Sequence, residues 1–185
     1  MIQTLRTTAT AAAVALAFGA GAATAADDTP FGGPESQEYA ATLWQALTEE
    51  RLAGDNAIDG VPYRGTEPHG AMLETFFTTM TVDGHTGMVA VKRNYGPAGV
   101  EQSAVQGNRA EHLGAVTVMF QREDGYDPDN MNWFWAKYLP DGSLDTNPAG
   151  MQLAGRVAKG ADQGCIACHS AAPGGDYLYV TDFVR

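Results

Sequence analysis

Between residues 71 and 138, short runs of β-branched and aromatic residues alternate with turn signals, and this alternation constrains the fold more than any other feature of the chain. The pattern predicts four strands, at residues 71–82, 88–95, 113–121 and 132–138. Three Asp-Gly pairs fall between or after these strands: Asp83-Gly84, Asp124-Gly125 and Asp141-Gly142. Because glycine supplies the positive φ angle that tight turns need, these pairs are typical of turns in an antiparallel sheet.

The clearest helical pattern lies at residues 34–52, before the strands. Its apolar residues repeat at helical spacing: Tyr39, Leu43, Ala46 and Leu47. Pro34 suits the first position of a helix, and Gly54 suits the left-handed residue just past its end. Loops are predicted at residues 54–68, 96–111 and 140–164. The predicted fold class is therefore mainly β (α+β), an antiparallel sheet packed against one or two helices.

The first 26 residues have the pattern of a secretory signal peptide. Arg6 precedes an apolar, alanine-rich stretch at residues 9–22, and the small residues at 23–26 offer a cleavage site. The apolar stretch is too short to span a hydrocarbon core of roughly 30 Å. We therefore expect a signal peptide at 1–26 and one domain at 27–185, secreted to the periplasm and free of the membrane after cleavage.

The chain is acidic, with a formal net charge of −11 at pH 7 that becomes −12 once residues 1–26, whose only charge is Arg6, are removed. An acidic surface repels phosphate backbones, and the sequence has no cluster of Lys and Arg that could neutralise several phosphates at once. The composition therefore disfavours nucleic acid as a partner and suits a basic redox partner protein.

The only two cysteines lie in Cys165-Ile166-Ala167-Cys168-His169, which has the spacing of a covalent haem attachment sequence. Two thiols separated by two residues can each add to one of two neighbouring haem vinyl groups, which leaves the next residue under the iron. We therefore predict one covalent haem c on the C-terminal segment, bonded to Cys165 and Cys168, with His169 as the iron ligand.

Three alternative roles for the cysteine pair fit the sequence less well than haem attachment. A structural zinc site normally takes four ligands from two separated pairs, and the sequence has no second cysteine pair. A thioredoxin-like redox pair lies early in a βαβ unit, whereas only 16 residues follow His169. A disulfide between cysteines so close together would close too small a ring to stabilise a domain. Chance occurrence of the motif is the remaining alternative.

The ligand on the other face of the iron separates electron carriers from gas-binding and catalytic haem proteins. Neither Met nor His follows His169, whereas small helical electron-transfer cytochromes carry their motif early and their Met ligand far downstream. We therefore expect an open sixth position. Methionines more often fill core gaps, and histidines beside turns more often lie at the surface. The upstream candidates for a sixth ligand are Met72, Met80, Met88, Met119, Met131, Met151, His69, His85 and His112.

The chain resembles the cytochrome P-460 family, which also contains the beta class of cytochrome c prime. The resemblance covers residues 67–180 and consists of several collinear pieces: 68–70, 89–95, 114–120, 125–128, 132–138, the attachment motif and Asp176-Tyr177. It implies a large antiparallel sheet with few helices, usually a homodimer, and a five-coordinate, histidine-ligated haem.

The family contains two functional kinds. The P-460 kind oxidises hydroxylamine and nitric oxide and carries a bond between a lysine and a meso carbon of the porphyrin. The beta-class cytochromes c prime lack this bond and bind nitric oxide or carbon monoxide in an apolar pocket. By resemblance the ligand would be a small nitrogen oxide or gas, and the activity that of a hydroxylamine or nitric oxide oxidoreductase. The alternatives are a non-enzymatic gas-binding protein and a low-spin electron-transfer cytochrome c.

Lys92 follows Val89-Ala90-Val91 where the family's cross-linking lysine falls in a similar strand. On a strand it would share a face with Met88, Ala90 and Asn94, so a solvated lysine on an exposed face is an equal alternative. The sequence assigns neither the phenylalanine that caps the iron in the beta class nor the distal carboxylate of the P-460 kind. Residues considered for pocket or core positions are Phe76, Phe77, Trp133, Phe134, Trp135, Glu101 and Glu111.

Overall fold

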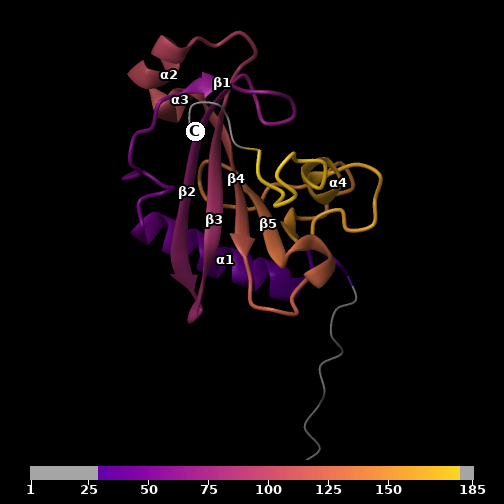
Figure 1. Cartoon of the computed structure of the whole chain (residues 1–185). Coiled ribbons are helices and arrows are strands. Elements are labelled where there is room, and N and C mark those ends of the chain that lie inside the picture. The colour runs from indigo at the N-terminus through magenta and orange to yellow at the C-terminus, as the bar shows by residue number, and fades with distance from the viewer. Residues whose placement is uncertain (1–28, 180–185) are drawn as a thin grey trace, which may run out of the picture.

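The computed structural model describes residues 29–179, so the predicted signal peptide lies outside the described residues. Its strands form one antiparallel sheet in which each strand pairs with the next in sequence (Figure 1). The strands are β1 (Tyr63–Arg64), β2 (Met72–Val82), β3 (His85–Tyr95), β4 (Leu113–Gln121), β5 (Trp133–Tyr138) and β6 (Ala154–Gly155). The helices are α1 (Pro34–Glu49), α2 (Gln102–Gly107), α3 (Arg109–His112), η1 (Pro128–Asn130) and α4 (Cys165–His169). The mainly β class with few helices is confirmed.

All four strands predicted from sequence are present, as β2 to β5. The strand β4 has the predicted bounds, whereas β3 begins earlier than predicted, at His85. The reason is the two-residue turn of Asp83 and Gly84, whose φ angles are 48° and 78°. Such a turn matches the twist of the strands on either side, so pairing continues to the hairpin end, where Val82 lies opposite His85.

The three predicted loops contain short elements that the sequence pattern did not indicate. Residues 54–68 include β1, residues 96–111 include α2 and most of α3, and residues 140–164 include β6. A two-residue strand or a single helical turn is too short to show a hydrophobic period. The strands β1 and β6 form because neighbouring strands supply their hydrogen-bond partners.

Helix α1 begins at Pro34 as predicted but ends at Glu49, and Gly54 is not its terminal left-handed residue. Arg51 takes that role instead, with a φ angle of 59°. The Leu52 amide donates to the Leu47 carbonyl over 2.8 Å, which is the bond that closes a Schellman motif. Neither α1 nor any other helix within residues 29–179 is long and apolar enough to cross a bilayer.

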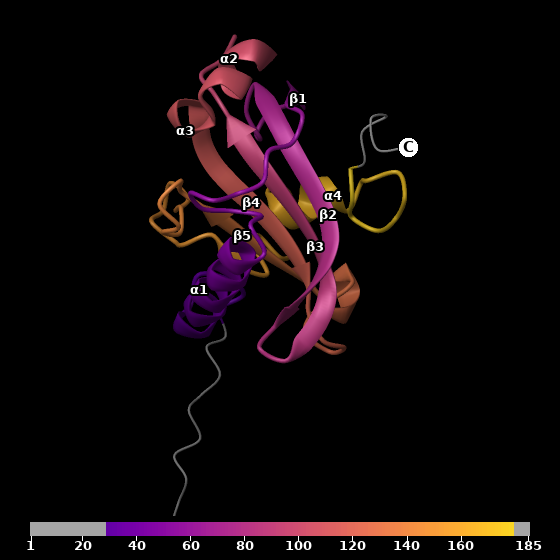
Figure 2. The ribbon, with the colours of Figure 1, turned by 90° about the vertical axis from the view of Figure 1, so that its left-hand side faces the viewer.

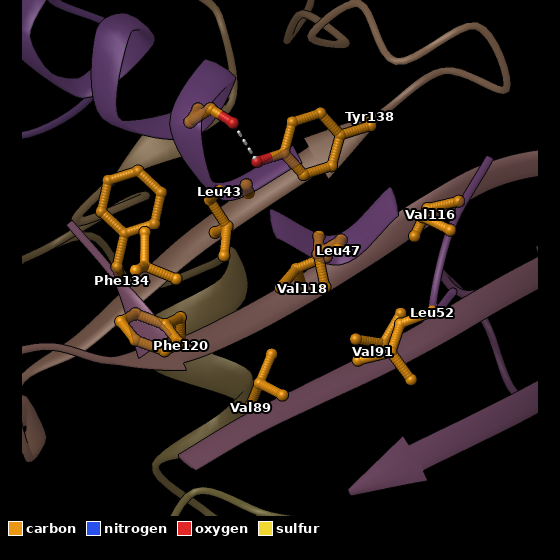
Figure 3. Close-up of a cluster of buried hydrophobic side chains, with 14 of the residues drawn as sticks. Leu43, Leu47, Leu52, Val89, Val91, Val116, Val118, Phe120, Phe134 and Tyr138 are labelled. Atoms are coloured by element: carbon orange, nitrogen blue, oxygen red, sulfur yellow. Dashed lines mark hydrogen bonds between the residues drawn. The ribbon is translucent and has the colours of Figure 1, made fainter. Parts of the chain in front are cut away.

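The main core lies between α1 and one face of the sheet (Figure 3). Leu43 and Leu47 are fully buried, and each such side chain contributes roughly 1.5–3 kcal/mol relative to an exposed one. The Tyr138 hydroxyl donates to the Ala40 carbonyl over 2.8 Å and so fixes α1 to β5. The strands supply the following core residues: Val89, Val91, Val116, Val118, Phe120 and Phe134.

The opposite face of the sheet carries a second apolar cluster and the cysteine motif. Successive side chains of a strand point to opposite faces, so Ala90, Met119 and Trp135 face away from α1. Helix α4 packs against this cluster through Ile166. Figure 2 shows α1 and α4 on opposite sides of the sheet. The sheet is therefore a middle layer between α1 and the C-terminal segment.

A buried ionic network joins β2 and β3 to the segment that follows α1. Glu74 is fully buried and receives hydrogen bonds from Arg93 Nη1 at 3.2 Å, Arg109 Nε at 2.9 Å and Tyr95 Oη at 2.6 Å. Arg93 also donates to the Leu52 carbonyl. A buried carboxylate needs such partners because its desolvation is otherwise costly.

Candidate functional site

The cysteine motif forms α4, a helix of five residues. Cys165, Cys168 and His169 are separated by three and four positions, so they lie on one face of this helix. Gly164 precedes the helix with a φ angle of 121°, and a Cβ there would lie 2.5 Å from the Cβ of Ala158. The helix can therefore begin at this point only after a glycine.

The imidazole of His169 is buried and held in one orientation. Its Nδ1 donates to the Tyr177 carbonyl over 2.7 Å, and its ring lies edge-on to Trp135 and Tyr179, with centroids 5.0 and 5.4 Å away. Burial lowers the pKa of His169, which favours the neutral imidazole. With the proton on Nδ1, the Nε2 lone pair is free to bind a metal, as in histidine ligands oriented by a backbone carbonyl.

A cavity of about 720 Å³ lies between α4 and the sheet. Two rows of sheet residues form part of its wall. Neighbouring strands place Ala90, Met119 and Trp135 in an apolar row, and Lys92, Thr117 and Lys137 in a polar row beside it. The remaining lining residues include Phe31, Leu153, Val157, Ala158, Cys165, Cys168 and His169. The volume is typical of cofactor sites, which measure roughly 300–1,000 Å³.

Lys92 lies in the wall of this cavity, and its exposed fraction is only 9 %. Within residues 29–179 its ammonium group makes no ion pair or hydrogen bond, and burial lowers the pKa of Lys92. The alternative of a solvated lysine on an exposed face disagrees with this burial. The structure therefore brings Lys92, Cys165, Cys168 and His169 to one cavity, while whether Lys92 is bonded to a cofactor stays a prediction.

His69 and Met119 line the cavity, in contrast to the other sixth-ligand candidates. The His69 ring centroid lies 6.0 Å from that of His169, with the two ring planes at 86°. His69 Nδ1 lies 3.3 Å from the Thr117 hydroxyl, which also accepts from Asn94 Nδ2. Burial and the neighbouring charges of Lys92 and His169 lower the pKa of His69 to about 4, so its imidazole is neutral.

The remaining sixth-ligand candidates lie elsewhere. His85 contacts the Gln121 carbonyl and His112 contacts the Gly96 carbonyl, both outside the cavity lining. Met80 belongs to the core under α1 and Met72 to a small cluster with Tyr95. The cavity lining also excludes Met88, Met131 and Met151.

The aromatic and acidic residues that were considered from sequence lie in different parts of the structure, and only some of them are on the cavity side of the sheet. Trp133 and Trp135 face the cavity side of the sheet, and Phe134 packs under α1. Phe76 packs with the α1 core and Phe77 with the cavity-side cluster. Neither Glu101 nor Glu111 lines the cavity.

Sequence reasoning missed Thr117 and Lys137, which complete the polar row. The available signal was a polar residue within an otherwise apolar strand, since Thr117 stands between Val116 and Val118. It also missed the indole Nε1 of Trp135, a buried donor that has no hydrogen-bond partner within residues 29–179. A haem has a broad apolar ring and two carboxylates at one edge, so these rows and this unpaired donor, together with the thiols and imidazole of α4, fit a haem.

An apolar cavity bordered by a Cys-X-X-Cys-His turn is the arrangement of a c-type cytochrome. The family model for Cytochrome P460 matches residues 54–180, most of the chain, so the chain belongs to the cytochrome P460 family and its cofactor is a haem. No curated protein and no solved structure matches the chain significantly.

Proposed function

We propose that this protein is a periplasmic monohaem cytochrome that oxidises hydroxylamine or nitric oxide and passes the electrons to a redox partner protein. The haem is bonded to Cys165 and Cys168 and ligated by His169. The observation that carries the proposal is the position of Lys92, which is buried, unpaired within residues 29–179 and in the same cavity wall as the attachment motif. In the family resemblance, this lysine separates the oxidising kind from the gas-binding kind.

The residues of α4 hold the cofactor in place. Two thioether bonds from one helical turn fix the position of the ring, and the Tyr177 carbonyl fixes the orientation of the His169 imidazole. The bound haem supplies an iron that binds small nitrogen ligands and exchanges electrons with them. The apolar row of Ala90, Met119 and Trp135 excludes water from the cavity.

Lys92 could supply the nucleophile for a third covalent bond to the haem, because its burial favours the unprotonated amine. Such a bond would replace one hydrogen on Nζ and one on the ring, so its formation would need a two-electron oxidant, for example hydrogen peroxide, which would be reduced to two water molecules. With haem bound, a third bond would distort the macrocycle, which is one of the means by which a protein tunes a haem.

The non-enzymatic gas-binding function of the beta class is the second candidate. It is favoured by the apolar part of the cavity wall, which suits an uncharged diatomic gas: Phe31, Ala90, Met119, Leu153 and Val157.

Peptide mass spectrometry of haem-loaded protein tests the choice between these two functions. We expect a tryptic peptide containing Lys92 to be linked through haem to the peptide of Cys165 and Cys168. Lys137 lies in the same polar row and is the internal control, since its peptide should be unmodified. An unmodified Lys92 peptide from fully loaded protein would reject the cross-link and favour the gas-binding function.

A further inference from the structure

The orientation of the His169 imidazole depends on a segment outside α4. Helix α4 has only five residues and no side-chain cap at Gly164, and a helix this short is not stable alone. The Tyr177 carbonyl, which accepts from His169 Nδ1, lies in the segment that follows α4. Tyr177 has a φ angle of 68°, a left-handed conformation that a bulky residue keeps only where its surroundings hold it. What holds Tyr177 therefore also holds the imidazole.

The side chain of Tyr177 is bonded to the connection between β4 and β5, which contains η1. The Tyr177 hydroxyl donates to Asn130 Oδ1 over 3.1 Å, and Asn130 Nδ2 donates to Asp127 Oδ2 over 2.9 Å. Asn130 is only 8 % exposed and Asp127 only 1 %. A chain of hydrogen bonds therefore runs from the buried carboxylate of Asp127 to the residue whose carbonyl orients His169.

The second carboxylate oxygen of Asp127 binds the segment that precedes α4. Lys159 Nζ forms an ion pair with Asp127 Oδ1, and Lys159 precedes Cys165 in the segment that leads into α4. One carboxylate thus holds chain on both sides of the attachment motif, directly through Lys159 and through Asn130 to Tyr177. Both of its oxygen atoms are used for this purpose.

The position of Asp127 is set by the sheet. Its amide donates to Asn132 Oδ1 over 2.9 Å, and the Asn132 amide donates back to the Asp127 carbonyl over 2.8 Å. The next residue, Trp133, begins β5, and its Nε1 donates to the Asp176 carbonyl over 3.2 Å. The start of β5 therefore fixes both Asp127 and the residue before Tyr177.

Stabilisation of a loop is the simpler explanation of a buried ion pair, but it does not account for this arrangement. Lys159 Nζ also lies 3.5 Å from Asp129 Oδ2, whose side chain is 85 % exposed, so the ammonium has a second carboxylate partner at the surface. Burial of a carboxylate is costly unless every oxygen is bonded. Here the second oxygen binds Asn130, and Asn130 binds the Tyr177 hydroxyl.

We propose that Asp127 is a positioning residue for the iron ligand. Through Asn130 and Tyr177 it holds the carbonyl that accepts from His169 Nδ1. Such a hydrogen bond raises the basicity of a ligating imidazole, which favours ferric over ferrous iron. The proposal rests on the ligation of haem by His169 proposed above, and it names the residues that set the strength of that ligand.

Resonance Raman spectra of the intact, haem-loaded ferrous protein and its midpoint potential test this assignment. Tyr177→Phe removes only the hydroxyl, and Asp127→Asn leaves an amide that can keep only one of the two carboxylate bonds. In each variant we expect the iron–histidine stretching band to shift to lower frequency and the midpoint potential to rise, because the imidazole becomes a weaker donor. The double variant should shift no further than the larger single variant, since the two residues act through one chain of bonds.

Tyr138→Phe is the matched control for a loss of stability alone. It removes a buried hydroxyl that donates to the Ala40 carbonyl on the other side of the sheet. Its free energy of unfolding should fall, while the iron–histidine band and the potential should equal those of the wild type. An equal shift of the band in Tyr138→Phe would show that general loosening causes it, which overturns the assignment.

An unchanged band and potential in Tyr177→Phe overturn the assignment without any other variant, so poor folding of Asp127→Asn does not leave it untested. A shift in Tyr177→Phe that is absent from Asp127→Asn also rejects the role of Asp127. Haem staining after denaturing electrophoresis is read separately. Loss of the stain from the wild-type protein would reject the haem attachment itself, whereas stained variants with unchanged bands reject only the positioning role.

Discussion

Trp135 packs edge-on against His169, with 5.0 Å between the ring centroids and 70° between the ring planes. The indole belongs to β5 and the imidazole to α4, so this contact joins the sheet to the helix that carries the attachment motif. It is one of the means by which the sheet fixes His169, the histidine that we propose as the iron ligand.

We expect Trp135→Ala to lower the free energy of unfolding by about 3–5 kcal/mol, because it empties a buried site that the surroundings fill only in part. Urea unfolding of haem-loaded protein measures the change. Trp44→Ala is the control, since Trp44 is only partly buried and packs at the edge of the core under α1. An equal loss of unfolding free energy in both variants would contradict a larger contribution of Trp135 to stability.

The double substitution Cys165→Ser and Cys168→Ser, combined with Lys92→Ala, should abolish covalent haem, because all three residues proposed to bond the haem are removed. Denaturing electrophoresis followed by haem-peroxidase staining measures this. Each single cysteine substitution should leave one thioether bond and therefore a stained band. A stained band from the triple variant would show that a further residue holds the haem.

Replacement of Glu74 by Ala should destabilise the protein by about 3–5 kcal/mol, since it leaves the guanidinium of Arg93 buried and without its carboxylate partner. Thermal or urea unfolding gives the value. Glu123→Ala is the comparison, because Glu123 pairs with Arg122 at the surface, where a salt bridge contributes about 0–1 kcal/mol. A small effect at both positions would mean that the buried network does not stabilise the fold.

His69 makes stability depend on pH in the acid range. Its pKa is lowered from 6.5 to about 4 in the folded protein, so between these values the unfolded chain binds more protons than the folded one. Stability is therefore fully present above pH 6.5 and falls as the pH decreases towards 4. The loss should be on the order of 2–3 kcal/mol, and His69→Gln should not show it. Unfolding curves collected across this range would contradict the prediction if both proteins lost stability equally.

The strands could be predicted from sequence because each is a local pattern, and alternation along 113–121 predicts the bounds of β4. The spacing of Cys165 and Cys168 is also a local pattern; it predicts a haem, which the family match supports, while the bonds to these cysteines stay a prediction. The cavity wall could not be predicted, because it depends on strand register. Lys92 lies opposite Thr117, and His69 lies near His169, only in the folded sheet. Each pair joins residues that are far apart in sequence, so no local pattern predicts it.

The end of α1 is a local feature, but its left-handed residue was also predicted at the wrong position. Glycine is the usual left-handed residue at a helix end, so Gly54 was the expected position. Arg51 takes this conformation because Leu52 must turn back to Leu47 for its side chain to enter the core. The burial of Leu52 therefore outweighs the steric cost of a positive φ angle at Arg51.

The attachment helix comes after every strand of the sheet in chain order. As the chain is synthesised, β3, β4 and β5 can pair and form their part of the cavity wall before Cys165 and Cys168 have emerged. The thiols would then meet a wall that is already built, and the final fold leaves Cys168 exposed and Cys165 half-buried. Haem addition can thus be a late step in folding. In that step, the segment that carries α4 packs against the finished sheet with the cofactor attached.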